Sequence, residues 1–267
     1  MIKDTSYSAY ILPVRDGRVA LLKYGKNGYG PIGGRLDDGE DFLTALHREL
    51  TEELGIDATI LADNSVEVPV PYAFRHPTPE RAKKRGAWGE EHHFYIVHVP
   101  DDVELNFCEE RDEEISVAWI APDDLLNPQI TPFDDMREFY QTHILPNINC
   151  RFSMGLRSQY YQMILSGDKD IELRLYDGKR RKMHNGDTVL LYDGQNRANY
   201  ARYRIVRMHI ARSFADLATK ISVPRTGFAN LSQLMHAISA FYNEEQESKY
   251  GVVGLELTPV DLSSIQI

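Results

Sequence analysis

Three glutamates in one short segment carry carboxylates at spacings that bring them together on a helix. Glu49, Glu52 and Glu53 stand at positions i, i+3 and i+4 of the segment RELTEELG, residues 48–55. Like charges at these spacings repel by about a few tenths of a kcal/mol, so the cluster needs a compensating cation. Carboxylate oxygens suit Mg²⁺ or Mn²⁺, which bridge to substrate phosphates. The sequence therefore predicts a divalent-metal site, and the carbonyl of Gly33 is a further candidate ligand because glycine allows a close backbone approach.

The three acids belong to a longer pattern of fixed residues. The fixed positions are Gly34, Glu40, Arg48, Glu49, Leu50, Glu52, Glu53, Gly55 and Ile56. Written as G-x5-E-x7-R-E-U-x-E-E-x-G-U, with U an apolar residue, this pattern resembles the signature of the Nudix hydrolases at every position. The resemblance implies an α/β/α sandwich over roughly residues 5–146. It also implies Mg²⁺-dependent hydrolysis of a nucleoside diphosphate linked to another group.

The same resemblance implies a role for each polar residue of the pattern. Glu52 and Glu53 are expected to be metal ligands, and Glu49 a ligand or the general base. Arg48 and Glu40 are expected to orient these acids. Family members often take one more acid from outside the pattern, and the candidates here are Glu110, Glu113 and Glu114, of which we select Glu113. The metal would neutralise the diphosphate, and a water activated by a carboxylate or by the metal would attack phosphorus.

Substrate contacts are expected from residues outside the acidic cluster. Segment 74–91 is polar and punctuated by Pro and Gly, which predicts a long loop. Arg35 and the loop residues Lys83, Lys84 and Arg85 are candidates to bind phosphates, and Trp88 is a candidate to stack on a base. The alternative is a solvated loop that Trp88 anchors. Pro71 and Tyr72, adjacent in the sequence, leave ADP-ribose and dinucleoside polyphosphates both open as substrates.

A second group of charged residues lies in the C-terminal half. Lys169, Glu172 and Arg174 fit the pattern G-x-K-x-x-E-x-R, and are followed by a Gly-Asp turn at 186–187 and by Tyr-Gly-Val at 250–252. This combination resembles the ASCH domain, a PUA-like β-barrel associated with RNA or modified nucleosides, over about residues 151–260. On an alternating strand Glu172 and Arg174 share one face, where they either form a surface ion pair or converge on a ligand.

The resemblance includes one departure that bears on catalysis. Some ASCH-type proteins are amidohydrolases acting on N4-acetylcytidine, and they pair the Lys with a Thr three residues on. Glu172 stands at that position here, which removes the hydroxyl nucleophile, although a Lys–Glu pair can still activate water. Binding is therefore favoured over catalysis. The basic residues that follow, expected to meet phosphates, are Lys179, Arg180, Arg181 and Lys182.

Length and charge favour two domains with different partners. The 267 residues, 42% of them hydrophobic, suffice for two cores. The first 150 residues hold 14 Lys and Arg against 28 Asp and Glu, whereas the rest hold 16 against 12. Cys108 and Cys150 have neither disulfide nor zinc spacing. No apolar run of 18 residues and no secretory signal is present, so we expect a cytoplasmic chain that does not bind membranes. The Nudix resemblance allows a homodimer.

Periodicity supplies the elements that must position these residues. We expect strands at 7–14, 18–24, 28–34, 92–99 and 115–121, helices at 40–54 and 133–145, and a linker at 145–149. In the second half we expect helices at 158–167, 213–220 and 231–243, and strands at 170–176, 187–193, 199–210 and 250–257. The predicted fold class is α+β, with a Nudix α/β/α sandwich at 1–147 followed by a PUA-like β-barrel at 150–267.

The predicted function is a Mg²⁺-dependent Nudix pyrophosphohydrolase whose ASCH domain recognises RNA or a nucleotide. Two alternatives remain open. The first is an RNA-binding protein whose Nudix half senses a ligand without catalysis, against which the intact acids at 49, 52 and 53 argue. The second is a bifunctional enzyme that also deacylates a modified cytidine, which Glu172 in place of Thr disfavours.

Overall fold

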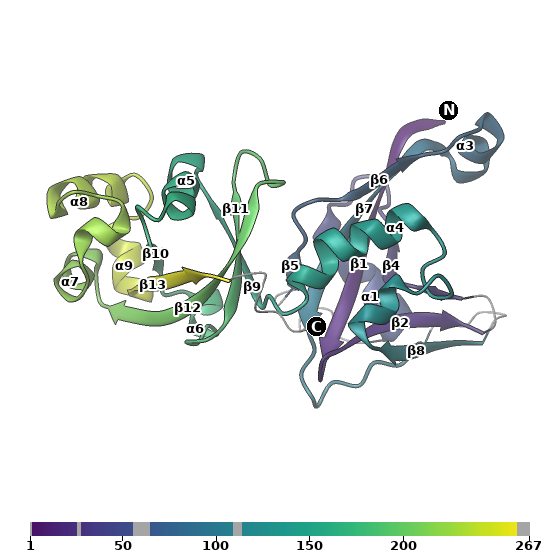
Figure 1. Ribbon diagram of the computed structural model, residues 1–267, viewed down its shortest axis with the longest axis horizontal. Coiled ribbons are helices and arrows are strands. Elements are labelled where there is room, and N and C mark those ends of the chain that lie inside the picture. Colours follow the sequence, from purple (N-terminus) through teal and green to yellow (C-terminus); the bar gives the residue numbers. More distant parts are fainter. Residues whose placement is uncertain (1, 26–27, 56–64, 109–113, 261–267) are drawn as a thin grey trace. The chain divides into compact units, whose positions relative to one another are not determined.

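The computed structural model describes residues 2–25, 28–55, 65–108 and 114–260. The chain divides into two compact units, Met1–Arg151 and Phe152–Ile267 (Figure 1). Within the described ranges, no helix is long and apolar enough to cross a membrane.

The N-terminal unit is built on a mixed eight-stranded sheet. Its strands are β1 (Lys3–Arg15), β2 (Arg18–Tyr24), β3 (Tyr29–Gly30), β4 (Ile32–Arg35), β5 (Ser65–Glu67), β6 (Tyr72–Arg75), β7 (Ala87–His98) and β8 (Ile115–Ile120). The central path runs β3-β2-β1-β7-β5, while β4 pairs with β1, β6 with β7 and β8 with β2. β1 and β7 are parallel, and the other strand pairs among the described residues of this sheet are antiparallel.

Alternate residues of β1 pack on opposite sides of this sheet. Ala9 and Ile11 share a core cluster with Leu46 and Leu50 of helix α1 (Phe42–Leu54). Burying an Ile or Leu side chain fully contributes about 1.5–3 kcal/mol. The apolar face of α1 is therefore held on the sheet, and its charged face remains available for the acidic cluster.

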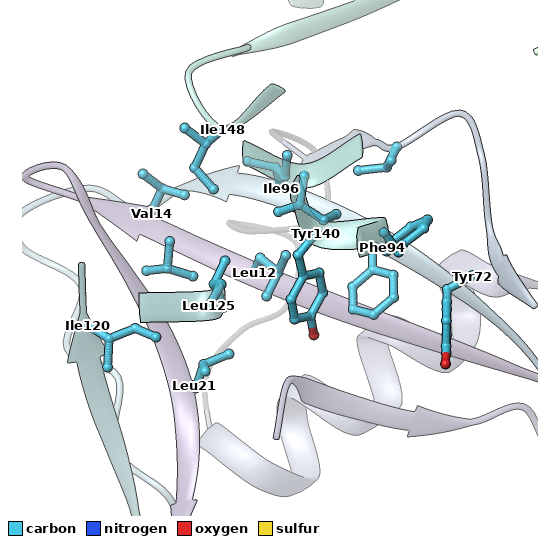
Figure 2. Packing of buried hydrophobic residues seen from close by; sticks show 14 residues of the cluster. Leu12, Val14, Leu21, Tyr72, Phe94, Ile96, Ile120, Leu125, Tyr140 and Ile148 are labelled. Atoms are coloured by element: carbon cyan, nitrogen blue, oxygen red, sulfur yellow. The ribbon is translucent and has the colours of Figure 1, made fainter. Parts of the chain in front are cut away.

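The opposite side of the sheet packs on the last helical segment of this unit (Figure 2). Leu12 and Phe94 lie in one cluster with Tyr140, which begins the π-helical turn η2 (Tyr140–Ile144) after helix α4 (Asp134–Phe139). Helices on both sides of one sheet make the α/β/α sandwich that the sequence predicted.

The predicted helix 133–145 is not α-helical to its end. After η2 comes the 3₁₀ turn η3 (Leu145–Asn147), where Pro146 lacks the N–H that an α-helix would need. Ile148 is then buried in the same core cluster. Segment 145–149, expected to be a linker, thus packs with the N-terminal unit, and the division between the units follows Arg151.

Segment 74–91 is not the long loop that its composition predicted. It contains the end of β6, helix α3 (Pro79–Arg85) and the start of β7. The hydroxyl of Thr78 accepts a hydrogen bond from the Arg81 N–H and caps α3, while Gly86 ends it in the left-handed region at φ 78°. The Pro, Thr and Gly that suggested a loop are therefore the start and stop signals of a short helix.

The C-terminal unit is a curled five-stranded sheet in the order β10-β13-β12-β11-β9 (Figure 1). The strands are β9 (Phe152–Leu156), β10 (Ile171–Leu175), β11 (Thr188–Asp193), β12 (Tyr200–Ala211) and β13 (Val252–Pro259). The helices are α5 (Ser158–Ser166), α6 (Gly178–Arg181), α7 (Phe214–Lys220), α8 (Leu231–Ser239) and α9 (Glu244–Tyr250). Of these, β9, α6 and α9 were not predicted. A curled sheet of this kind is the half-barrel expected for a PUA-like fold.

Two clusters form the core of this unit. One contains Tyr161 and Ile164 of α5, and the other contains Leu217 of α7 with Leu234 and Ile238 of α8. The second cluster packs against β10, the strand that carries Glu172 and Arg174. Folding of α7 and α8 onto β10 therefore positions the second charged group.

We expect Phe94→Ala to lower the free energy of unfolding of the N-terminal unit by about 3–5 kcal/mol, because Phe94 is fully buried. Both tryptophans, Trp88 and Trp119, lie in this unit. Their fluorescence during urea unfolding therefore reports on it. Leu43→Ala is the control, since Leu43 is 50% exposed and should change the stability by no more than about 0.5 kcal/mol. Equal effects of the two substitutions would contradict the core assignment.

Candidate functional site

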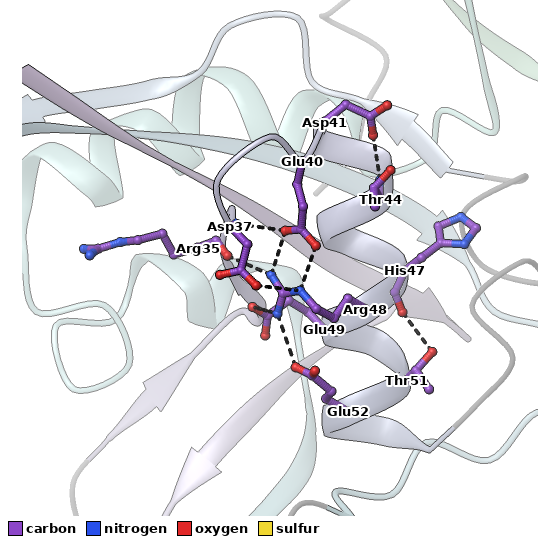
Figure 3. Close-up of polar contacts among 10 residues, drawn as sticks. All are labelled: Arg35, Asp37, Glu40, Asp41, Thr44, His47, Arg48, Glu49, Thr51 and Glu52. Atoms are coloured by element: carbon purple, nitrogen blue, oxygen red, sulfur yellow. Dashed lines mark hydrogen bonds and ion pairs between the residues drawn. The ribbon is translucent and has the colours of Figure 1, made fainter. Parts of the chain in front are cut away.

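Arg48 lies at the centre of the acidic cluster (Figure 3). Its guanidinium donates to both carboxylate oxygens of Glu40, at 2.9 and 3.0 Å. It also donates to Glu49 at 2.9 Å and to Glu52 at 3.2 Å. A fifth hydrogen bond, of 2.9 Å, reaches the backbone carbonyl of Arg35 at the end of β4. In this structure Arg48 therefore compensates the repulsion between Glu49 and Glu52. The sequence predicted for Arg48 only the role of orienting these acids.

Glu53, the third acid, is directed to the glycines of β4. It is 3% exposed, and its carboxylate accepts a hydrogen bond of 2.8 Å from the Gly33 N–H. Gly33 has φ 120°, and a Cβ atom there would collide with the carbonyl oxygen of Ala9 on β1. Only glycine fits at this position against β1. The hydrogen bond from its N–H to Glu53 joins β4 to α1.

Gly34 makes room for Glu49 in the same way. A Cβ atom on Gly34 would lie 2.6 Å from the carboxyl carbon of Glu49. The Glu49 carboxylate thus rests directly against the β4 backbone. Gly34, the first glycine of the sequence pattern, thus accommodates Glu49, while Gly33 before it donates to Glu53.

The carboxylates of Glu49, Glu52 and Glu53 and the Gly33 carbonyl suit a hard divalent cation, although the three carboxylates do not converge on one position. Within the described residues, no three His, Cys, Asp or Glu side chains are arranged to hold a metal ion. Glu52 is 54% exposed in its side chain, so it can turn away from Arg48 without unpacking the core. Oxygen ligands from three carboxylates and one backbone carbonyl are those that Mg²⁺ or Mn²⁺ prefers. Glu113, the predicted acid from outside the pattern, lies outside the described residues, as does Glu110.

A cavity of about 430 Å³ lies in the same unit, and among the described residues that line it there is no acid of this cluster. Gly30 and Pro31, which lead into β4, form part of its wall. Aromatic and basic side chains form much of the rest, among them Tyr10, Tyr72, Phe74, Arg75, Arg81 and Arg85. Arg35 connects the two regions, because its carbonyl contacts Arg48 while its guanidinium lies 3.8 Å from Glu90 in the cavity wall.

Glu90 is a buried carboxylate in this wall. His76 and His92 contact its two oxygens through Nε2 at 3.0 and 3.1 Å, and Arg85 lies 3.7 Å away. Burial would raise the pKa of Glu90, but the hydrogen bonds from the two histidines and the charge of Arg85 leave it below its ordinary value. Burial lowers the pKa of His92. The cavity therefore presents a charged carboxylate flanked by imidazoles.

The sequence placed only some of these residues at the cavity. Lys83, Lys84 and Trp88 lie outside the lining that the described residues form, whereas the predicted Arg85 belongs to it. Arg81 of the same segment, which was not predicted, belongs to it as well. Glu90 was missed altogether. The alternation of β7, which turns every second residue to one side of the sheet, was the signal that could have found it.

The second charged group is a buried ion triad in the C-terminal unit. Lys169 and Glu172 are each 4% exposed. One oxygen of Glu172 lies 3.2 Å from the Lys169 ammonium, and the other accepts from Arg174 at 2.7 Å. All three line a cavity of about 320 Å³ that also includes Tyr160 and Phe241. The pairing of Glu172 with Arg174 is therefore not a surface ion pair.

The basic residues that follow the triad are mostly engaged with the protein. Lys179 donates to the Ser153 carbonyl at 3.0 Å, and burial lowers the pKa of Lys179. Arg181 donates to the Tyr250 carbonyl at 3.0 Å. Arg180 pairs with Asp177 but also lines the cavity. Arg180 is thus the member of this run that is placed to meet a ligand.

Comparison with known families identifies both units. The model of the NUDIX domain matches residues 5–142, just over half of the chain, and the model of the ASCH domain matches residues 154–261. Both resemblances drawn from the sequence are thereby confirmed. The N-terminal unit is a Nudix domain, and the C-terminal unit is an ASCH domain.

Individual relatives resemble part of the chain. Nudix hydrolase 25 of Arabidopsis thaliana is 32% identical over 110 residues, which are 38% of this chain and 61% of that protein. The RNA pyrophosphohydrolase of Erythrobacter litoralis is 35% identical over 119 residues, 42% of this chain and 67% of that protein. Among solved structures, the MutT protein of Methanosarcina mazei is 19% identical, covers 53% of this chain and 94% of its own, and has a TM-score of 0.38.

The acidic cluster makes a prediction about pH. Hydrogen bonds from Arg48, and then from the Asp37 N–H, lower the pKa of Glu40 to about 2. A lowered pKa means that this contact stabilises the fold above the ordinary glutamate pKa of about 4.3, and that the contribution is lost as pH falls towards 2. In Arg48→Gln the pKa of Glu40 should rise towards its ordinary value, as measured by NMR titration of the side-chain carboxyl.

The control for this titration is Lys3→Gln. Lys3 pairs with Asp38, two residues from Glu40, and lowers the pKa of Asp38. This substitution should raise the pKa of Asp38 and leave that of Glu40 unchanged. If Glu40 titrates alike in wild type and Arg48→Gln, Arg48 does not organise the cluster.

Proposed function

Because the chain belongs to the Nudix hydrolase family, we propose that it is a Mg²⁺- or Mn²⁺-dependent pyrophosphohydrolase that cleaves a nucleoside diphosphate linked to another group. The observation that carries this proposal is the link that Arg35 makes between the acidic cluster and the 430 Å³ cavity, because its carbonyl accepts a hydrogen bond from Arg48 and its guanidinium lies 3.8 Å from Glu90 in the cavity wall. The acids supply the reaction centre, and the cavity supplies room for the nucleoside. A volume of this size lies within the usual range for small-molecule sites.

The residues of the cluster divide into ligands and positioning groups. Glu52 and Glu53 would hold the cation together with the Gly33 carbonyl, and Glu49 would act as a further ligand or as the general base. A bound Mg²⁺ or Mn²⁺ would neutralise the charge of the diphosphate. Arg48 positions these acids through the contacts described above. Release of Glu52 from Arg48 would allow it to turn to the cation.

The cavity would orient the substrate relative to these acids. Tyr10 and Phe74 provide aromatic surface for a base, and Arg81 and Arg85 provide charge for phosphate groups. Glu90 offers a carboxylate that accepts hydrogen bonds from N–H groups of a base. Holding the reacting groups in place supplies much of the rate enhancement in phosphoryl transfer.

We propose that the ASCH domain recognises RNA or a nucleotide. The support for this is the ion triad of Lys169, Glu172 and Arg174, which lies in a cavity that also contains aromatic side chains. One relative of the N-terminal domain is named an RNA pyrophosphohydrolase, so 5′-triphosphorylated RNA belongs among the substrates to test.

We expect Glu53→Gln to reduce hydrolysis by about 10²–10³-fold, the usual cost of removing one electrostatic stabiliser from such a site. The amide oxygen of Gln can still accept from the Gly33 N–H, so the fold should persist. Phosphate release is measured with Mg²⁺ across nucleoside triphosphates, ADP-ribose, dinucleoside polyphosphates and 5′-triphosphorylated or capped RNA. Excess EDTA should abolish the activity of the wild-type protein.

Glu138→Gln is the matched control, because Glu138 is exposed on α4 of the same unit. It should retain wild-type turnover. Wild-type turnover by Glu53→Gln, or full activity in EDTA, would disprove the assignment of the acids. If the wild-type protein hydrolyses none of these substrates yet binds one, the Nudix domain is a ligand sensor.

A further inference from the structure

The cavity of the ASCH domain has the size of a site for one small molecule. Its volume of about 320 Å³ is near the lower end of the range for ligand sites. The residues that line it all belong to the C-terminal unit, and most of them lie on or next to β9, α5, β10 and α8. A site of this size holds one nucleotide more readily than a strand of several.

The walls of this cavity are aromatic. Tyr160 of α5 lies 5.9 Å from Phe228 and 6.3 Å from Phe241, measured between ring centroids. Tyr242, which follows Phe241, lines the cavity as well. Rings at such distances form a surface on which a planar base can stack.

The ion triad forms the polar part of the cavity lining, and all three N–H donors of Lys169 are directed at protein atoms. The Lys169 ammonium donates to the carbonyls of Ile171 at 2.7 Å and Thr226 at 3.1 Å, and its third neighbour is Glu172 at 3.2 Å. An ammonium has three donors, so Lys169 has none left for a ligand. We therefore assign it to positioning Glu172.

Glu172 retains the capacity to bind a ligand. Each carboxylate oxygen has two lone-pair sites, and Lys169 and Arg174 occupy one on each oxygen. The remaining sites accept hydrogen bonds from N–H groups. The edge of a nucleobase that carries an amino group supplies such donors.

The cavity also carries a surplus of positive charge. Its lining contains four cations, Arg157, Lys169, Arg174 and Arg180, against one carboxylate, Glu172. Arg157 is exposed and lies over the ring of Phe241 at 3.9 Å, so its guanidinium is held at the aromatic wall. A ligand that combines a planar base with an anionic group would match both features.

We propose that this cavity binds a nucleoside 5′-monophosphate, with the base stacked on the aromatic surface and the phosphate on Arg157 and Arg180. The source of this ligand is the reaction proposed for the Nudix domain, so the proposal rests on that proposed function. In that reaction water adds to one phosphorus and the bridging P–O bond breaks, which yields a nucleoside monophosphate and the phosphate ester of the other group. The ASCH domain then binds a product of the Nudix domain.

Isothermal titration of the full-length protein with AMP, GMP, CMP and UMP, in EDTA, tests this proposal. At least one monophosphate should bind, and its affinity should exceed that of the matching nucleoside and of inorganic phosphate by about tenfold or more, because both halves of the ligand make contacts. EDTA and the use of monophosphates keep the result independent of hydrolysis. A failure of the hydrolysis assay therefore leaves this titration interpretable.

Two variants locate the site, and a third controls for charge. Arg157→Gln and Phe241→Leu, both at exposed positions, should each weaken binding about tenfold or more. Arg204→Gln removes a positive charge from an exposed position on β12 outside the cavity lining, and it should bind as the wild type does. Circular dichroism checks that the variants are folded.

Three results would overturn the proposal. The first is no binding of any monophosphate at high protein concentration, and the second is binding that neither Arg157→Gln nor Phe241→Leu weakens. The third is tighter binding of a single-stranded oligoribonucleotide than of every monophosphate. Arg157 also borders an open depression lined by Ser158, Tyr192 and Arg197, where such a strand would continue. The third result would therefore indicate that the cavity and this depression together bind RNA.

Discussion

The N-terminal site depends on one guanidinium surrounded by carboxylates. Arg48 contacts Glu40 in the loop before α1, Glu49 and Glu52 on the helix, and the backbone at the end of β4. A guanidinium carries five donors in a rigid plane, so it can join these elements simultaneously, whereas a lysine ammonium has three donors and no fixed plane. The arrangement also explains how three acids can lie within two helical turns of a folded chain. Arg48 offsets the repulsion between two of them, and the Gly33 N–H stabilises the third.

The C-terminal site uses the same principle in a more buried setting. Glu172 lies between Lys169 and Arg174, and both Glu172 and Lys169 are almost completely removed from solvent. Charges in such a place are costly unless each is paired and hydrogen-bonded, so the triad is a rigid unit. Glu52 in the first site, by contrast, is more than half exposed and can change partners. The first cluster is suited to exchanging a cation, and the second to presenting a fixed pattern of donors and acceptors.

The sequence revealed candidate functional groups where several charged residues share a local spacing. The acidic cluster and the triad were both found in this way, because helix and strand periods place i, i+3, i+4 and i, i+2 neighbours together without knowledge of the fold. Glu90 was missed because the predicted strand began at residue 92, so the alternation that places Glu90 beside His92 was not applied to it. Its other partners, His76 and Arg35, come from other segments. Segment 74–91 was misjudged for a related reason: β6 is a strand because it pairs with β7, and its own composition does not show this.

The replacement of a hydroxyl by Glu172 changes what the ASCH domain can do. Burial lowers the pKa of Lys169, an effect that the charge of Glu172 opposes. A lysine that acts as a base or nucleophile must direct its nitrogen at the ligand, but that of Lys169 is turned to two carbonyls and to Glu172. A Thr at position 172 would have offered a hydroxyl to be activated, whereas an ionised carboxylate only accepts hydrogen bonds. With the lysine engaged and no hydroxyl beside it, the triad lacks the nucleophile that covalent deacylation needs, whereas Glu172 can accept hydrogen bonds from N–H groups. We therefore infer that the triad favours binding over covalent deacylation.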